Sequence, residues 1–498
     1  MNTRKRAGLV AALGVLTVGA AVASGIVVGD FGTKRDAKLA DESETLFGID
    51  KPLASSSLTS IDLATAQTSP LKLATLARGL KARVVTSGVA GANIDQFALW
   101  PNGTSPTHLI ACNEQGTTEA GLQRIAIATG AVETIVTGTT ACDGVRRTAW
   151  GTILFSEEAG SGGQTYELIN PLTTTGVTLT RTTGVFSGGA GAANLVRRTA
   201  VGRLSFEGHG LLPNGVMYYG DENRPGSGNP GGAYFKFVPA TPFAGGAPIA
   251  SLDQSPLKRG KVLGLRLGRN NGNTDFGQGT QAGRGVWVAI CDDADADVTK
   301  QCASQNPALR TKASDNKLTA YYRPEDLEVS PPDLAAGRVK VCGNNTGNEF
   351  QDRYWGETVC ITDGTVAESL AGTAVPEVKN LVIGSADMAM TDNIASQPGP
   401  AGRWLIAEDG DVGFGSSITP GKNNDMFLCL PDGADVDDQS DGCVKVATLN
   451  DAGTAAHTEG AEWTGPIFSD DGKHLYVSVQ HNITEKGVVL DITGWDED

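Results

Sequence analysis

The sequence predicts an all-β fold, a β-propeller of about six blades, and three observations support this prediction. From Arg83 onward, short apolar runs alternate with clusters of Gly, Asn, Asp and Pro. Turn signals such as Pro213-Asn214-Gly215 recur along the chain, as they do in hairpins and meanders. No long stretch has helical periodicity. Among all-β folds, a propeller suits a chain of 498 residues because radial closure leaves few strand edges exposed.

The first 23 residues have the features of an export signal. Met1–Arg6 is basic, Ala7–Val22 is apolar, and Ala21-Val22-Ala23 is a small-x-small cleavage site. A retained anchor is the alternative, because the apolar run continues to Val28. We expect cleavage, which predicts a periplasmic or secreted bacterial protein without a membrane span.

Two further segments follow this signal. Residues 24–82 are rich in Ser, Thr, Ala and Lys, which makes them a poor core and predicts a linker or a wrapping arm with short helices. Residues 83–498 carry the strand pattern and are predicted to form one propeller domain.

The charge of the chain and its missing motifs exclude several classes of protein. The formal net charge is −16, whereas a nucleic-acid-binding protein normally needs a basic face. The sequence has no G-x-S-x-G elbow, no H-E-x-x-H motif and no P-loop. Basic doublets at Arg146-Arg147 and Arg197-Arg198 either steer an anion or are solvated loop residues.

Eight cysteines follow the signal, and none has C-x-x-C spacing. An even number in an exported chain predicts disulfides. The sequence does not fix their connectivity, but pairing neighbours gives Cys112–Cys142, Cys291–Cys302, Cys342–Cys360 and Cys429–Cys443.

Carboxylates stand at the ends of several predicted strands, beside glycine or aromatic residues. Ca²⁺ takes six to eight oxygen ligands, mostly from carboxylates and carbonyls, so a ring of such ends would suit it. The alternative is that they are solvated turn residues. The acids concerned are Glu157, Glu158, Glu207, Asp221, Glu222, Glu325, Asp326, Glu408, Asp409 and Glu462.

At these places the sequence resembles the PhoX-type alkaline phosphatases, a family of secreted bacterial enzymes. The shared motifs occur in the family's order over roughly residues 90 to 490. They are Cys142 with Trp150-Gly-Thr152 and Glu157-Glu158, Gly202-Arg203 with Phe206-Glu207, Tyr219-Gly-Asp221-Glu222 with Tyr234-Phe-Lys-Phe237, Arg323-Pro-Glu-Asp326, Trp404 to Asp409-Gly410, and Glu462 to Gln480-His481.

The resemblance implies a propeller whose central pocket holds Ca²⁺ and iron as Fe³⁺ and hydrolyses phosphate monoesters and some diesters. Its partner would then be a small phosphate ester. Arg323 would be the catalytic residue that binds the substrate phosphate, since a guanidinium fork pairs with phosphate oxygens. The implied metal ligands are Glu207, Glu325, Asp409 and Glu462, with Cys142 and either Glu157 or Glu158 on the iron side.

Three departures from the family pattern leave alternatives open. Phe206 replaces a histidine, Glu222 replaces an aspartate, and the segment after Cys142 differs in sequence and length. If Cys142 is bonded to Cys112, it is not an iron ligand, and a calcium-dependent or inactive relative gains weight. Arg323 could also be a buried structural bridge to a neighbouring acid. The rival functions are a Ca²⁺-dependent propeller lactonase or esterase and a non-catalytic, calcium-stabilised envelope propeller.

Overall fold

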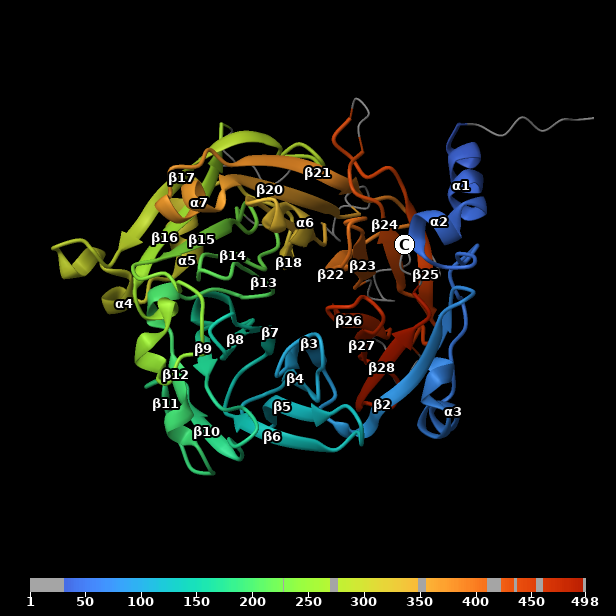
Figure 1. Ribbon diagram of the computed structural model, residues 1–498, viewed down its shortest axis with the longest axis horizontal. Coiled ribbons are helices and arrows are strands. Elements are labelled where there is room, and N and C mark those ends of the chain that lie inside the picture. Colours follow the sequence, from blue (N-terminus) through green and yellow to red (C-terminus); the bar gives the residue numbers. More distant parts are fainter. Residues whose placement is uncertain are drawn as a thin grey trace, which may run out of the picture.

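Five β-sheets stand radially around a central axis in the computed structural model of the chain (Figure 1). The structure describes residues 31–226, 228–268, 276–347, 355–409, 422–433, 437–453 and 460–495. The predicted signal peptide, residues 1–23, lies outside these ranges. In the described residues, no helix combines the length and the apolar character that a membrane crossing requires.

The strands follow one another mainly as antiparallel meanders. The first sheet has the order β11-β10-β6-β5-β4-β3 and the second β12-β9-β8-β7. Their strands are β3 (Ile94–Trp100), β4 (His108–Asn113), β5 (Ala120–Ala126), β6 (Val132–Thr137), β7 (Cys142–Arg147), β8 (Ile153–Glu157), β9 (Thr165–Leu168), β10 (Val177–Thr180), β11 (Val185–Ser187) and β12 (Leu195–Arg197).

The third sheet has nine strands in the order β13-β14-β15-β16-β17-β21-β20-β19-β18. Its strands are β13 (His209–Leu211), β14 (Met217–Gly220), β15 (Tyr234–Pro239), β16 (Gly260–Leu267), β17 (Gly283–Asp292), β18 (Pro324–Val329), β19 (Arg338–Asn345), β20 (Glu357–Thr365) and β21 (Glu377–Ile383).

The last two sheets have the orders β1-β25-β24-β23-β22 and β2-β28-β27-β26. Their strands are β1 (Ala74–Leu76), β2 (Lys81–Ala90), β22 (Thr391–Ser396), β23 (Trp404–Glu408), β24 (Asp425–Cys429), β25 (Cys443–Leu449), β26 (Glu462–Phe468), β27 (Leu475–Gln480) and β28 (Gly487–Thr493).

Helices are short and lie between or outside the sheets. The α-helices are α1 (Phe31–Asp41), α2 (Ser43–Phe47), α3 (Leu63–Thr68), α4 (Cys302–Gln305), α5 (Leu309–Asp315), α6 (Pro331–Ala335) and α7 (Val366–Ala371). The 3₁₀ turns are η1 (Pro70–Leu73), η2 (Gly160–Gly162), η3 (Ala192–Asn194), η4 (Thr199–Val201), η5 (Leu252–Gln254), η6 (Pro256–Lys258) and η7 (Val298–Lys300).

The expectation of six separate blades is wrong in its count. The outer strand β17 pairs with β21 at Gly283–Val378 and Arg284–Glu377, which joins two meanders into the nine-stranded sheet. That sheet curls back on itself, because its end strands β13 and β18 contact each other. The six innermost strands nevertheless form one ring, in which β3, β7, β13, β18, β22 and β26 contact one another in succession and β26 contacts β3.

The first propeller strand closes the ring with the last one. β2 pairs antiparallel with β28 from Lys81–Thr493 to Ala90–Gly487. This pairing gives the last sheet its outer strand from the opposite end of the chain and covers the edge of β28 at the seam.

Part of the segment before the propeller packs on the sheet that contains β25. β1 pairs with β25, and Phe47 and Ile49 are buried in the same core cluster as Leu428 and Val446. In Figure 1, α1, α2 and α3 lie along the outside of this sheet and of β2.

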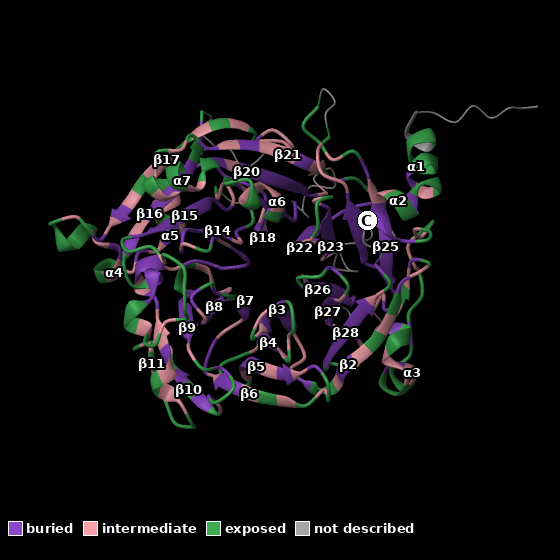
Figure 2. Ribbon diagram, viewed as in Figure 1, coloured by how far each residue is buried: buried purple, intermediate pink, exposed green. Residues whose placement is uncertain are grey.

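Burial rises from the rim to the centre. The outer strands β2, β11 and β17 contain several exposed residues. The inner strands β3, β18, β22 and β26 are almost wholly buried (Figure 2). Polar side chains on these inner strands are therefore out of bulk water, and each one needs a partner.

The nine-stranded sheet buries one balanced group of charges away from the axis. Lys236 and Asp363 form an ion pair in which both side chains are fully buried. Asp363 also accepts hydrogen bonds from Tyr218 and, at 2.7 Å, from the Trp287 indole, and Lys236 lies over both rings. This ion pair has a full set of partners within the sheet.

All four disulfides predicted by pairing neighbouring cysteines are present. They are Cys112–Cys142, Cys291–Cys302, Cys342–Cys360 and Cys429–Cys443, and no free cysteine remains.

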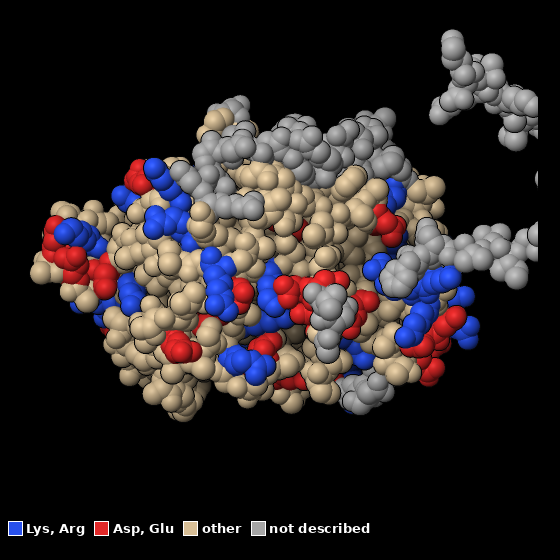
Figure 3. Space-filling view, turned by 90° about the horizontal axis from the view of Figure 1, so that it is seen from above, with Lys and Arg blue, Asp and Glu red and all other residues tan. Residues whose placement is uncertain are grey.

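The side view of the molecule shows mixed surface charge (Figure 3). Blue and red side chains lie next to each other, and much of this face is uncharged. The described residues of this face form no single basic surface of the kind that binds nucleic acid.

Candidate metal and phosphate site

The inner ring brings together carboxylates from every sheet. Each lies on an inner strand, just before one, or on the turn that follows one of its neighbours. They are Asp95 on β3, Glu114 after β4, Asp143 on β7, Glu158 after β8, Glu207 before β13, Glu222 after β14, Glu325 on β18, Asp392 on β22, Asp409 after β23 and Glu462 on β26.

Three groups of these carboxylates have the spacing that a metal ion requires. Within each group, one oxygen of every side chain lies within 4.8 Å of the others. The groups are Glu114, Asp143 and Glu158; Glu207, Glu325 and Asp392; and Asp392, Asp409 and Glu462. Because Asp392 belongs to two of them, five carboxylates form one continuous acidic surface.

Burial and mutual repulsion perturb the acids strongly. Burial raises the pKa of Glu325 to about 8, although Arg323 opposes the shift. Burial, followed by repulsion from Asp409, likewise raises the pKa of Glu462 well above its usual range. Asp95, Asp143, Glu158, Glu207 and Asp392 shift in the same direction. Such shifts are typical of functional sites.

Asp409 behaves differently from its neighbours. Burial alone would raise its pKa, but a hydrogen bond with Glu462 and the charge of Arg323 outweigh burial and lower it. The same guanidinium lowers the pKa of Glu222 against its burial.

Arg323 is the cation among these acids. Its Nε lies 2.7 Å from Glu222 Oε1 and 2.8 Å from Glu325 Oε1, and its Nη1 lies 3.1 Å from Asp409 Oδ2. Its φ of 61° is in the left-handed region, which is uncommon for a residue with a side chain. Within the described residues Nη2 has no hydrogen bond, so one edge of the guanidinium remains for another partner.

A second arginine supports this arrangement from behind. Arg310 holds Asp221 through both carboxylate oxygens, at 2.7 Å from Nη2 to Oδ1 and 2.9 Å from Nε to Oδ2. It also donates to the Glu222 carbonyl oxygen at 2.6 Å. The Asp221-Glu222 pair thus divides its roles, because Asp221 anchors the turn and Glu222 faces Arg323.

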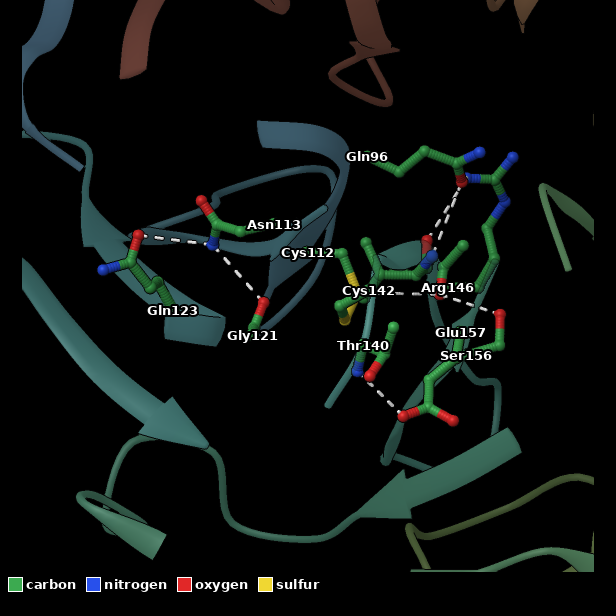
Figure 4. The surroundings of a disulfide bond; sticks show 12 residues. Gln96, Cys112, Asn113, Gly121, Gln123, Thr140, Cys142, Arg146, Ser156 and Glu157 are labelled. Atoms are coloured by element: carbon green, nitrogen blue, oxygen red, sulfur yellow. Dashed lines mark hydrogen bonds between the residues drawn. A yellow bond between two sulfur atoms is a disulfide. The ribbon is translucent and has the colours of Figure 1, made fainter. Parts of the chain in front are cut away.

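Cys142 is not available as a metal ligand, which corrects the assignment implied by the resemblance. Its sulfur is bonded to Cys112 at 2.06 Å, and a disulfide sulfur is not a thiolate (Figure 4). The bond instead links the two segments that carry Glu114 and Asp143, because Glu114 follows Cys112 by two residues and Asp143 follows Cys142 directly.

Glu157 is also outside the metal groups. Arg181 donates to it from Nε at 2.7 Å and from Nη2 at 3.1 Å, and the Thr140 amide donates at 3.0 Å. Figure 4 shows the side chain turned toward Thr140. Of the two acids, Glu158 is therefore the one that joins Glu114 and Asp143.

The donor set suits a hard cation. Asp143 is 1% exposed and Asp95 is 5% exposed, yet Oδ1 of each has no hydrogen-bond partner in the described part of the chain. Buried carboxylate oxygens without a donor are costly unless a cation neutralises them. Oxygen-only donors fit Ca²⁺, whereas an iron site with a sulfur ligand does not fit these residues.

Most of the residues singled out from the sequence meet at the axis. Glu158, Glu207, Glu325, Asp409 and Glu462 belong to the three groups and Arg323 lies among them, while Cys142 and Glu157 do not belong. Sequence reasoning missed Asp95, Glu114, Asp143 and Asp392. Glu114 and Asp143 lie within two residues of cysteines, and we assigned a disulfide or an iron ligand to these cysteines without considering the acids.

Other predicted features have structural partners. Phe206 is buried and stacks on His209 at 5.9 Å, so it fills the core. Arg146 donates to Asp326 at 2.8 Å, and Arg198 donates to Glu167 at 2.5 Å. His481 Nε2 lies 3.2 Å from Glu462 Oε1, which brings it to the acidic surface.

The sheets stand radially around a buried ring of carboxylates, and the Arg323 guanidinium lies among these carboxylates. This arrangement defines a class: β-propeller proteins with an acidic centre of the kind that suits cations. Residues 115–482 match the family of alkaline phosphatase PhoX. That match covers most of the chain, so the protein belongs to this family and is a phosphatase.

One solved structure, with a TM-score of 0.61, agrees on the fold. Pseudomonas fluorescens PhoX in complex with vanadate, a transition state analogue, matches with a TM-score of 0.61 and 16% identity over 91% of this chain and 100% of that chain. The gluconolactonase XC5397 from Xanthomonas campestris matches with a TM-score of 0.38 and 12% identity over 89% and 96%. No curated protein matches the sequence significantly.

Proposed function

We propose that the protein hydrolyses phosphate monoesters at its central acidic surface and that Ca²⁺ ions are its metal cofactor. The observation that carries the proposal is the set of three carboxylate groups, two of which contribute a partner of Arg323, namely Glu325 and Asp409. These residues provide oxygen ligands for hard cations and one guanidinium for an anion. Family membership favours this activity over the lactonase and scaffold alternatives.

Each part of the site has a role in this proposal. The groups built on Glu207, Glu325, Asp392, Asp409 and Glu462, and on Glu114, Asp143 and Glu158, would hold the ions. When bound, Ca²⁺ would offset charge on the phosphoryl oxygens and favour an oxygen nucleophile.

Arg323 would orient the phosphate. The Arg323 side chain is 15% exposed. Its guanidinium is always charged and presents a planar fork of N–H groups that suits phosphate oxygens. The acids that now share its N–H groups are the same acids that would bind cations. Neutralising them with Ca²⁺ would weaken their hold on Arg323 and leave more of its donors for the substrate.

Glu222 and Asp221 would keep Arg323 in place. Asp221 is fixed by Arg310, and Glu222 accepts from Arg323 Nε. Holding the guanidinium before the substrate arrives lowers the reorganisation needed in the transition state.

We also propose export to the periplasm or the cell exterior, with cleavage of residues 1–23. Four disulfides and no free cysteine support an oxidising compartment. Residues 24–82 as an arm and 83–498 as the catalytic domain remain part of this proposal.

The test is elemental analysis of the protein purified from its native host without chelators, with p-nitrophenyl phosphate turnover measured on the same sample. We expect calcium, no stoichiometric iron, turnover that a chelator abolishes and Ca²⁺ restores, and inhibition by vanadate. Glu325→Gln should lower calcium content and turnover together, whereas Glu368→Gln, an exposed helix residue, should change neither. Turnover by the metal-free protein, or stoichiometric iron, would contradict the proposal.

A further inference from the structure

One pocket is lined by arginines, so its charge is opposite to that of the carboxylate groups. None of its lining residues belongs to those groups. It has a volume of about 380 Å³, and no carboxylate and no large apolar side chain lines it. Three arginines contribute, and the other side chains are neutral and polar. The residues that matter are Gln164, Arg181, Thr182, Arg197, Arg203 and Asn306.

The three arginines reach this pocket from separate segments. Arg181 follows β10, Arg197 ends β12, and Arg203 follows η4. The Arg203 backbone is fixed by its amide, which donates to the Pro307 carbonyl at 2.8 Å, and by a parallel bridge to Ala308. The fold, and not one flexible loop, therefore assembles the positive charge.

Two of these arginines have no carboxylate partner in the described part of the chain. Arg197 Nη1 donates to the Arg181 carbonyl at 3.3 Å, and Arg203 Nε donates to the Asn306 carbonyl at 3.0 Å. An arginine has five N–H donors, so most of theirs remain unused. Arg146 and Arg310 behave differently, since each binds a carboxylate.

Arg181 differs from the other two because Glu157 neutralises it. This ion pair removes one positive charge, so two remain, on Arg197 and Arg203. The chain has a net charge of −16, so acidic residues are abundant. In the described residues, however, none of them pairs with Arg197 or Arg203.

The guanidinium of Arg197 has a defined position. It lies against Gly184, where a Cβ would be 2.6 Å from Arg197 Cζ, and the φ of Gly184 is 72°. A glycine turn thus makes room for the planar group. A guanidinium held in place loses less conformational entropy when it binds an anion.

We infer that this pocket binds an oxyanion of the phosphate class, with Arg197 and Arg203 as its charged donors. The fork of N–H groups on each guanidinium matches the tetrahedral oxygens of such an anion. The anion is either free inorganic phosphate or the phosphoryl group of an organic ester. This site is separate from the proposed hydrolytic site, since none of its lining residues belongs to the three carboxylate groups.

The test is isothermal titration of the full, metal-replete protein with inorganic phosphate, and in a second arm with phenylphosphonate. We expect two phosphate-binding events in the wild type. Arg197→Gln, alone and with Arg203→Gln, should weaken one of them by roughly tenfold for each arginine. Phenylphosphonate binding at the same event would show that an ester-borne phosphoryl group also enters; its exclusion would assign the site to free phosphate.

A second variant keeps the test informative if an arginine variant folds poorly. Thr182→Glu adds an acid to the lining at an exposed position and should also abolish the event, whereas Thr180→Glu adds the same charge nearby but outside the lining and should not. Turnover of p-nitrophenyl phosphate should stay unchanged in all these variants. A single event that Arg323→Ala removes, or two events that survive Thr182→Glu, would overturn the inference.

Discussion

The central ring and the interior of the nine-stranded sheet bury charge in opposite ways. At Lys236 and Asp363 the fold supplies one cation for one anion and completes the hydrogen bonds with Tyr218 and Trp287. At the axis, Arg323 contacts Glu325 and Asp409, which belong to two of the three carboxylate groups. The first arrangement needs nothing from outside. The second has an excess of carboxylates that the proposed Ca²⁺ ions would neutralise, and this imbalance distinguishes the candidate site from structural burial.

The largest effect is expected at Arg323. Arg323→Ala should lower kcat/KM for p-nitrophenyl phosphate by about 1,000-fold, since it removes a preorganised charged donor. Far-UV circular dichroism of the calcium-loaded variant should match that of the wild type. Arg147→Ala, at an exposed arginine on β7, is the matched control and should retain full activity. Wild-type turnover in Arg323→Ala would remove this residue from the mechanism.

Breaking the buried Lys236–Asp363 ion pair should lower the stability of the fold and leave catalysis unchanged. Lys236→Met leaves Asp363 buried without its cation and should lower the free energy of unfolding by about 4 kcal/mol. The exposed pair Lys379–Asp438 gives the control, because Lys379→Met should cost less than about 1 kcal/mol. Urea denaturation measures both. A turnover rate per folded Lys236→Met molecule far below that of the wild type would mean that the two regions are not independent.

The disulfide beside the ring connects stability with metal binding. Cys112→Ser with Cys142→Ser should cost about 3 kcal/mol, since the bridge closes a loop of 30 residues. It should also weaken calcium binding, because Glu114 and Asp143 lose the link between their strands. Cys429→Ser with Cys443→Ser removes a bridge far from these acids, so calcium titration should show wild-type affinity there. Equal calcium affinity in both double variants would contradict a positioning role for Cys112–Cys142.

A smaller effect is expected from a buried acid outside the metal groups. Burial raises the pKa of Glu357 to about 7. The folded state therefore holds the Glu357 proton more tightly than the unfolded state does. The contribution of this proton to stability is complete below pH 4.5 and is lost as pH rises through about 7. The wild type should therefore lose about 2 kcal/mol relative to Glu357→Gln between pH 5 and 7. Parallel pH profiles of the two proteins in urea denaturation would contradict this.

The sequence predicted the parts of the molecule that depend on local pattern. Alternating strands, turn signals and neighbouring cysteines identified the all-β fold and every disulfide. Glu207, Glu325, Asp409 and Glu462 were found because they lie at strand boundaries within family motifs. Pairing between strands far apart could not be read in this way, so the β17–β21 contact and hence the sheet count were missed. Asp392 was missed for the same reason, since only the ring brings it between Glu325 and Asp409.

The seam between β2 and β28 has a consequence for how the molecule is assembled. These strands are separated by almost the whole propeller, so the last sheet cannot form until residues 487–493 have been synthesised and have reached β2. Until then, β27 and β2 each present an unpaired edge, and the inner strand β26 that carries Glu462 has no completed sheet behind it. The acidic ring is therefore completed late, and a chain cut before Gly487 would expose strand edges that promote aggregation.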